Sequence, residues 1–135
     1  MSWPRRNKYN AQKTRGMDGD YYPSKCEAAV ADICYLMRLA GEIEDYAKQV
    51  QIQITDETKW KVDFGLIMPG GAECYVEAKG FETDLYRKKR ALYIKSDFKQ
   101  KLPLFIYGHQ KVRGRGGYEV YLKEAAWSDG MAPPF

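Results

Sequence analysis

The chain has very little histidine and cysteine. Its 135 residues include one His and three Cys. The cysteines, Cys26, Cys34 and Cys74, form no Cys-x-x-Cys pair and share no zinc-ligand spacing with His109. This argues against a structural zinc site. The odd number of cysteines, two of them in one predicted helix, favours reduced and partly buried thiols.

Long apolar runs are also missing. A transmembrane helix needs roughly 20 apolar residues, and no stretch comes near that length. The basic N-terminus is not followed by the apolar segment of a signal peptide. With 44% hydrophobic and 30% charged residues, the composition is that of one globular domain with a real core. We therefore expect no signal peptide, no membrane partner and a cytoplasmic location.

Positive charge is present in moderate excess, with a formal net charge of +4. It is concentrated in three segments: Arg5, Arg6, Lys8, Lys13 and Arg15; then Arg87, Lys88, Lys89 and Arg90; then Lys111, Arg113 and Arg115. Eleven tyrosines are interleaved with them, a combination that suits a nucleic-acid surface. Ordinary solvated faces explain the charge alone about equally well.

Periodicity predicts an α/β or α+β fold with a mixed central β-sheet flanked by helices. The expected elements are a helix over 24–40, a strand over 50–54, a hairpin over 60–79, a helix from Thr83 or Asp84 to about Asp97, and strands over 102–107 and 118–122. In the second helix, Leu85, Leu92 and Tyr93 are the expected core contacts. Residues 1–20 read as a flexible basic arm, 21–126 as the folded domain and 127–135 as a loosely ordered tail.

The predicted hairpin carries acids where strands usually carry apolar residues. Even-numbered residues are apolar in both strands, from Trp60 to Met68 and from Cys74 to Ala78. Because side chains alternate between faces, both apolar faces meet one core only when even residues pair with even residues. The loop Pro69-Gly70-Gly71 gives this parity. Asp63 then lies directly across from Glu77.

Two carboxylates facing each other destabilise a sheet unless a cation neutralises them. Mg²⁺ prefers hard oxygen ligands, commonly one or two carboxylates completed by waters and substrate phosphate. Lys79 projects from the same face as Glu77 and has the chemistry to hold an attacking water. The alternative is a solvated face with Glu–Lys pairs.

Glu27 has two competing roles. It lies three residues after the predicted N-cap Ser24, so it completes a capping box. It also has the position to bring a third carboxylate from the helix N-terminus to the sheet, where the helix dipole favours its ionised form. One side chain does not easily serve both roles.

Several motifs, taken in order, resemble the small phage-encoded PD-(D/E)XK endonucleases and share their layout with phage Holliday-junction resolvases. They are KYNAQKT (8–14), YPSKCEA (22–28), LAGEIEDY (39–46), VDF (62–64), VEAKGF (76–81) and YRKKRALY (86–93). The resemblance runs from Lys8 to Arg90, which is about two-thirds of the chain. One departure is Val62, which stands where the motif has proline.

The resemblance implies a restriction-endonuclease-like core and assigns the site residues. Asp63 and Glu77 would bind the metal, with the backbone carbonyl of Ala78 as a further ligand. Lys79 would be the catalytic lysine, and Glu27 the acidic residue from the first helix, as a catalytic group and a possible metal ligand. The implied cofactor is Mg²⁺, with Mn²⁺ able to substitute. The DNA contacts expected from the arm, both helices and the Gly-rich loop are Arg5, Arg6, Lys8, Lys13, Arg15, Lys25, Arg87, Lys88, Lys89, Arg113 and Arg115.

The implied activity is phosphodiester hydrolysis in branched DNA by a Holliday-junction resolvase, acting in the cytoplasm of a phage-infected bacterium. Two symmetric cuts at a junction call for a C2 homodimer. A phage endonuclease of broader specificity, such as a nickase or a flap or replication nuclease, is the alternative within the enzyme class. A DNA-binding protein that keeps a nuclease fold without catalysis is the alternative outside it.

Overall fold

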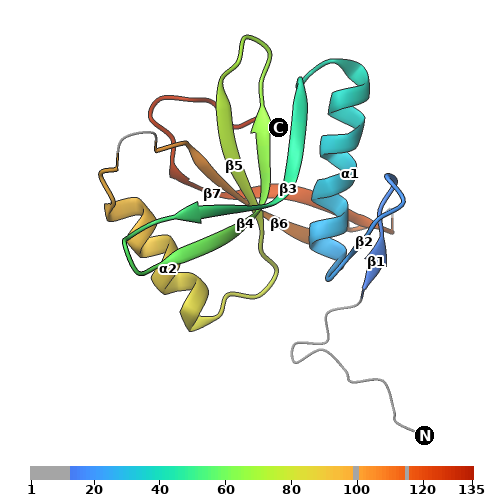
Figure 1. Cartoon of the computed structure of the whole chain (residues 1–135). Helices are drawn as coiled ribbons and strands as arrows, with labels where there is room; N and C mark the ends of the chain where they lie inside the picture. The colour runs from blue at the N-terminus through green and yellow to red at the C-terminus, as the bar shows by residue number, and fades with distance from the viewer. Residues whose placement is uncertain (1–12, 99–100, 115) are drawn as a thin grey trace, which may run out of the picture.

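The computed structural model describes residues 13–98, 101–114 and 116–135, and these form an α+β fold (Figure 1). In chain order the elements are β1 (Thr14–Arg15), β2 (Tyr21–Tyr22), α1 (Lys25–Ala40), β3 (Asp45–Gln53), β4 (Lys59–Ile67), β5 (Glu73–Ala78), α2 (Asp84–Lys95), β6 (Leu104–Lys111) and β7 (Tyr118–Trp127). In the described part of the chain, five strands form one mixed sheet in the order β3-β4-β5-β6-β7, which confirms the predicted α+β class with a mixed central sheet. Among the described strands, β5 and β6 are the one pair that runs in parallel, and α2 lies between them in the chain.

Helix α1 begins and ends where its sequence predicts. The hydroxyl of Ser24 accepts the backbone N–H of Glu27, and Gly41 ends the helix with a left-handed backbone (φ 75°) that glycine adopts without steric cost. Val30 and Cys34 on the predicted apolar stripe are buried against the sheet. All three cysteines are free and buried, as expected.

Helix α2 also begins at its predicted cap, Thr83, but its core contacts differ from the expected ones. Tyr86 and Tyr93 are buried, whereas Leu85 and Leu92 are 63% and 40% exposed, so the prediction for the two leucines is wrong. Residues seven apart share one helix face, and the two tyrosines occupy that face. Each leucine precedes a tyrosine by one position and therefore points away from the core.

Strand β4 serves two cores rather than the single one expected. Its even-numbered residues are all buried, in agreement with the predicted parity. However, Phe64 and Leu66 pack in the cluster beneath α1, whereas Trp60 and Val62 pack with Tyr86 and Tyr93 of α2. The expectation of one common core is therefore wrong.

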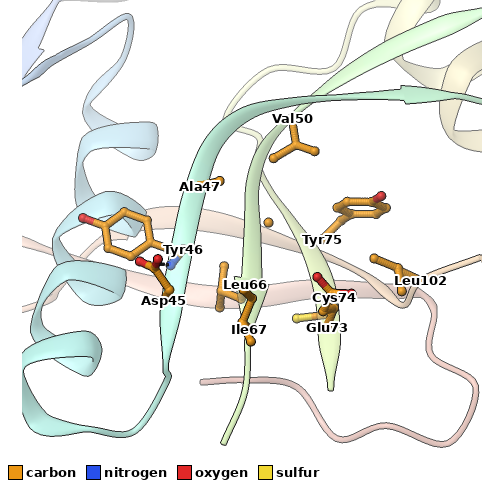
Figure 2. A pocket seen from close by; sticks show the side chains of 11 residues that line it. Asp45, Tyr46, Ala47, Val50, Leu66, Ile67, Glu73, Cys74, Tyr75 and Leu102 are labelled. Atoms are coloured by element: carbon orange, nitrogen blue, oxygen red, sulfur yellow. Dashed lines mark hydrogen bonds between the residues drawn. The ribbon is translucent and has the colours of Figure 1, made fainter. Parts of the chain in front are cut away.

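The cause is a bend in the sheet at Gln49 and Asp63. The β3–β4 pairs continue in one register on both sides of these residues but skip them, and Gln49 has a left-handed backbone with φ 53°. Figure 2 shows the β3 ribbon turning between Ala47 and Val50. Residues on one nominal face therefore reach different helices before and after the bend.

The two ends of the described chain pack on the domain. Residues 13–20, assigned to the flexible arm by sequence, include β1 and the turn that pairs it with β2. At the other end, the ring of Phe135 stacks on Tyr107 with centroids 4.1 Å apart, so the tail predicted to be loose is held by the domain itself. Among the described residues, neither helix is long and apolar enough to cross a membrane.

Candidate functional site

Asp63 and Glu77 meet where strands β4 and β5 stop pairing. The paired residues run from Ile67 and Glu73 to Phe64 and Val76, and the same register continued by one step reaches Asp63 and Glu77. There the side chains replace the backbone ladder. The N–H of Asp63 donates to Oε1 of Glu77 (2.6 Å), and the N–H of Ala78 donates to Oδ2 of Asp63 (2.9 Å).

Glu27 brings a third carboxylate to this point from the first turn of α1. Its backbone N–H serves the Ser24 cap, but its side chain accepts a hydrogen bond from Nε2 of Gln49 at 3.1 Å. Its Oε2 is buried and accepts no hydrogen bond. The side chain of Glu27 is therefore directed to the sheet, and only its backbone N–H takes part in the helix cap.

Gln49 is the site residue that the sequence did not reveal. The same Nε2 lies 3.5 Å from Oδ1 of Asp63, so one amide spans Glu27 and Asp63. In the sequence, Gln49 appears just before an alternating strand, and nothing there indicates a left-handed backbone. Only the position opposite Asp63, which follows from the β3–β4 register, gives it significance.

Burial and mutual repulsion favour the protonated forms of the two glutamates. Burial raises the pKa of Glu27 far above its usual value, and the neighbouring Asp63 and Glu77 raise it further. The pKa of Glu77 is raised by burial and by the charge of Asp63, while Lys79 acts in the opposite direction. In their ionised forms the three acids would therefore carry more negative charge than their surroundings neutralise, a common property of functional sites.

In the described part of the chain, Lys79 forms the ion pair that reaches this carboxylate group, with Glu77 as its partner. Its Nζ lies 3.8 Å from Oε2 of Glu77 and 4.8 Å from the ring centroid of Tyr86. Its backbone N–H donates to the carbonyl of Tyr107 in β6, and Lys123 of β7 reaches its carbonyl at 3.4 Å. The lysine is thus fixed by the sheet, with its ammonium at the edge of the carboxylate group.

The donor set suits a hard cation only in part. Within residues 13–98, 101–114 and 116–135, no group of three or more His, Cys, Asp or Glu side chains is arranged to hold a metal ion. Mg²⁺ is commonly held by one or two carboxylates, with waters and phosphate completing its shell, so the Asp63–Glu77 pair meets that lower requirement. The buried Oε2 of Glu27, which lacks a donor, is an oxygen that a cation or an ordered water would satisfy.

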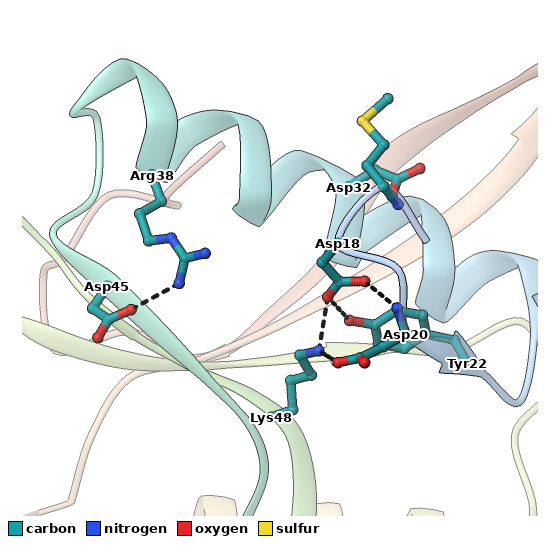
Figure 3. Close-up of polar contacts among 8 residues, drawn as sticks. Asp18, Asp20, Tyr22, Asp32, Arg38, Asp45 and Lys48 are labelled. Atoms are coloured by element: carbon teal, nitrogen blue, oxygen red, sulfur yellow. Dashed lines mark hydrogen bonds and ion pairs between the residues drawn. The ribbon is translucent and has the colours of Figure 1, made fainter. Parts of the chain in front are cut away.

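A cleft of about 380 Å³ opens beside the carboxylates, lined by Asp20, Tyr21, Tyr22, Pro23, Glu27, Lys48, Gln49 and Asp63. The β1–β2 turn forms its outer wall and is tied to β3 by Lys48, which donates to Asp18 (2.7 Å) and to Asp20 (Figure 3). Burial alone would raise the pKa of Asp18, but hydrogen bonds from Lys48 and Tyr22 lower it to about 2. The acids of this wall, Asp18 and Asp20, are therefore paired with Lys48 and do not depend on Lys79 for a counter-charge.

A second hollow, of about 220 Å³, lies on the sheet between β3, β4 and β5 (Figure 2). Its lining is largely apolar, with Val50, Leu66, Tyr75 and Leu102 among the labelled side chains. None of Glu27, Asp63, Glu77 or Lys79 lines it. Its charged lining residues are Asp45 and Glu73. Of the four candidate residues, Glu27 and Asp63 line the first cleft, and Glu77 and Lys79 line neither of these two hollows.

The residues predicted to contact DNA are spread over the surface. Lys13, Arg15, Lys25, Arg87, Lys88 and Arg113 are exposed and Lys89 is half-buried. Arg5, Arg6, Lys8 and Arg115 lie outside the described residues. Arg90, part of the same basic run, instead forms a two-pronged ion pair with Glu124 of β7, at 2.7 and 2.6 Å.

Comparisons of the chain with protein-family models, with curated proteins and with solved structures find no match. The resemblance to the PD-(D/E)XK endonucleases therefore stays a prediction from the sequence motifs. The structural observation that bears on function is the local geometry of five residues, Glu27, Gln49, Asp63, Glu77 and Lys79.

Proposed function

We propose that the protein is a metal-dependent DNA endonuclease with a PD-(D/E)XK-type core. The observation that carries the proposal is the convergence of Glu27, Asp63 and Glu77 from three separate elements, beside one ammonium group, Lys79. Burial and the neighbouring acids raise the pKa of both glutamates, a cost to the fold that uncharged side chains at these positions would not impose. A site for a divalent cation and a phosphodiester gives the charge a purpose.

In this proposal Asp63 and Glu77 hold Mg²⁺, or Mn²⁺ in its place, with the backbone carbonyl of Ala78 as a further ligand. The bound cation supplies positive charge that stabilises the phosphate in the transition state. Lys79 orients the attacking water and stabilises the negative charge that develops on it. Glu27 contributes a third oxygen at the edge of the site, directed there by Gln49.

The favoured substrate is branched DNA, with the Holliday junction first, cut by a C2 homodimer in the cytoplasm of an infected bacterium. The exposed basic residues of α2 and of the β6–β7 turn supply phosphate contacts. A nuclease of broader specificity, acting as a nickase or on flaps, would use the same active-site residues. A DNA-binding protein without catalysis is the remaining alternative, and it differs in having no metal-dependent cleavage.

The test compares cleavage of a four-way junction, a flap, linear duplex and single-stranded DNA, each with Mg²⁺, Mn²⁺ or EDTA. Metal-dependent cutting with preference for the junction supports the resolvase. Equal cutting of all substrates supports the broader nuclease. Binding without cutting supports the non-catalytic alternative and contradicts the enzyme.

Matched variants link cleavage to the site. Asp63→Asn is compared with Asp56→Asn, and Lys79→Ala with Lys61→Ala, because Asp56 and Lys61 are exposed residues of the same types. We expect only the site variants to lose cleavage while keeping DNA binding. Full activity in Lys79→Ala would contradict the assigned role of the lysine.

A further inference from the structure

Tyr86 carries a buried hydroxyl that finds no hydrogen-bond partner. The side chain is 4% exposed. In the described part of the chain, the buried side-chain oxygens and nitrogens without a partner are Tyr86 Oη and Oε2 of Glu27. Buried hydroxyls normally find a partner because leaving one unsatisfied costs stability. A phenylalanine would avoid this cost, so the hydroxyl gives the fold no advantage at this position. Any role of the side chain therefore lies in its ring.

The ring of Tyr86 lies directly under Lys79. The Lys79 ammonium is 4.8 Å from the ring centroid, within the range of a favourable cation–π contact. Its ion-pair partner, Oε2 of Glu77, is 3.8 Å away, too far for a hydrogen bond. The carboxylate therefore attracts the ammonium without a hydrogen bond that would fix its direction, and the ring face supplies a second favourable contact.

The ring is itself held rigidly. The backbone N–H of Tyr86 donates to the hydroxyl of Thr83, the N-cap of α2, at 3.1 Å. The indole of Trp60 meets the ring edge-on, with centroids 6.0 Å apart. The cap therefore fixes the backbone of Tyr86, and Trp60 restricts the orientation of its ring beneath the ammonium.

We propose that Tyr86 is a positioning residue: its ring holds the Lys79 ammonium beside Glu77, where the lysine takes part in the proposed reaction. The effect on cleavage rests on the function proposed above, whereas the contact itself does not. The π face is the functional part of the side chain, and the hydroxyl is dispensable. Leucine at this position would fill much of the volume but would leave the ammonium free to turn towards solvent.

The kinetic test is a double-mutant cycle between positions 86 and 79. We expect Tyr86→Phe to cut within about twofold of the parent and Tyr86→Leu to lower kcat about tenfold at unchanged KM. In a Lys79→Met background, Tyr86→Leu should lower the residual cleavage rate no further, because its effect passes through the lysine. Equal losses in both backgrounds, or a loss in Tyr86→Phe as large as in Tyr86→Leu, would overturn the proposal.

A spectroscopic test separates this proposal from the proposed function. Protons held over an aromatic face resonate upfield, so the ε-methylene signals of Lys79 should be shifted upfield in the parent protein and in Tyr86→Phe but not in Tyr86→Leu. Lys61, exposed on β4, is the control lysine. An unshifted Lys79 signal in the parent protein overturns the contact even if the protein cuts DNA. A shifted signal in a protein that cuts nothing supports the contact while the nuclease proposal fails.

Discussion

The backbone N–H of Asp63 donates to the carboxylate of Glu77 at 2.6 Å, at a position where the neighbouring residues of β4 and β5 pair through their backbones. The carboxylate of Asp63 in turn accepts the N–H of Ala78. Each acid thus replaces a missing strand contact. The two acids are anchored to the backbone, so the bend of the sheet and the geometry of the site depend on each other.

This relationship predicts different effects for two substitutions of Glu77. Glu77→Gln keeps an oxygen that can accept the N–H of Asp63, whereas Glu77→Ala leaves that N–H without its partner. We expect Glu77→Gln to fold with unchanged or higher stability at neutral pH and to lose cleavage on the order of a hundredfold or more. Glu77→Ala should also lose about 1–3 kcal/mol of stability. Urea unfolding beside the cleavage assay checks both, and equal stability of the two variants would contradict the anchoring role.

Glu27 should make the stability of the protein fall as pH rises. Its pKa in the folded protein is raised from the ordinary 4.5, so the folded state binds its proton more tightly than the unfolded state. The stabilisation that protonated Glu27 contributes to the folded state is complete below pH 4.5. It is lost as the pH rises towards the pKa of Glu27 in the folded protein. Glu27→Gln removes the titration, so in EDTA the variant should be more stable than the parent at pH 8, by about 1–3 kcal/mol. The difference should shrink as pH approaches 4.5.

The control for that experiment is Glu57→Gln, an exposed acid in the β3–β4 loop. Its stability should follow that of the parent across the pH range. If Glu27→Gln is instead less stable than the parent at every pH, the Glu27 carboxylate acts as a helix cap and not as an excess charge.

Mg²⁺ should stabilise the folded protein in the absence of DNA. A ligand that binds only the folded state adds RT ln(1 + [L]/Kd), about 2.7 kcal/mol at a hundred times Kd. We expect thermal unfolding to shift upward with Mg²⁺ in the parent and in Asp56→Asn, but not in Asp63→Asn or Glu77→Gln. Calorimetry measures the shift without relying on cleavage. A shift retained in both site variants would place the cation elsewhere.

The local elements could be predicted because their signals are local. The cap at Ser24, the stop at Gly41 and the even-residue parity of β4 and β5 each follow from a few neighbouring residues. The same parity also predicts that Asp63 lies across from Glu77. Periodicity alone could not reveal the bend, because parity describes a flat strand and does not say which helix covers each half.

Gln49 could not be recognised from the sequence for the same reason. Its importance comes from a left-handed backbone and a position across from Asp63, and both depend on tertiary pairing. The core role of Tyr86 also depends on how α2 is rotated against the sheet. Either tyrosines or leucines could have faced inward on the sequence pattern alone, and packing against Trp60 decides between them.

The backbone of Gln49 can be tested with two substitutions that both remove its amide. A left-handed backbone costs a residue with a Cβ roughly 1–2 kcal/mol more than it costs glycine. Gln49→Gly should therefore be more stable than Gln49→Ala by about 1 kcal/mol. Both variants should lose the hydrogen bond to Glu27, so both should cut more slowly. Gln51→Gly and Gln51→Ala form the control pair on the same strand, where alanine should be the better residue.

Arg90 and Arg87 belong to one basic run, but the structure gives them separate roles. Arg90 spans from α2 to Glu124 of β7 through two hydrogen bonds, whereas Arg87 is exposed and pairs with Asp84 of its own helix at 3.5 Å. Arg90→Ala should therefore lose about 1 kcal/mol of stability, and Arg87→Ala close to none. On DNA the order should reverse. Each lost phosphate contact reduces the slope of log K against log salt by about 0.9, so Arg87→Ala should flatten that slope and Arg90→Ala should leave it unchanged. Binding titrations at several salt concentrations measure this, and a flattened slope for Arg90→Ala alone would show that the ion pair opens to bind DNA.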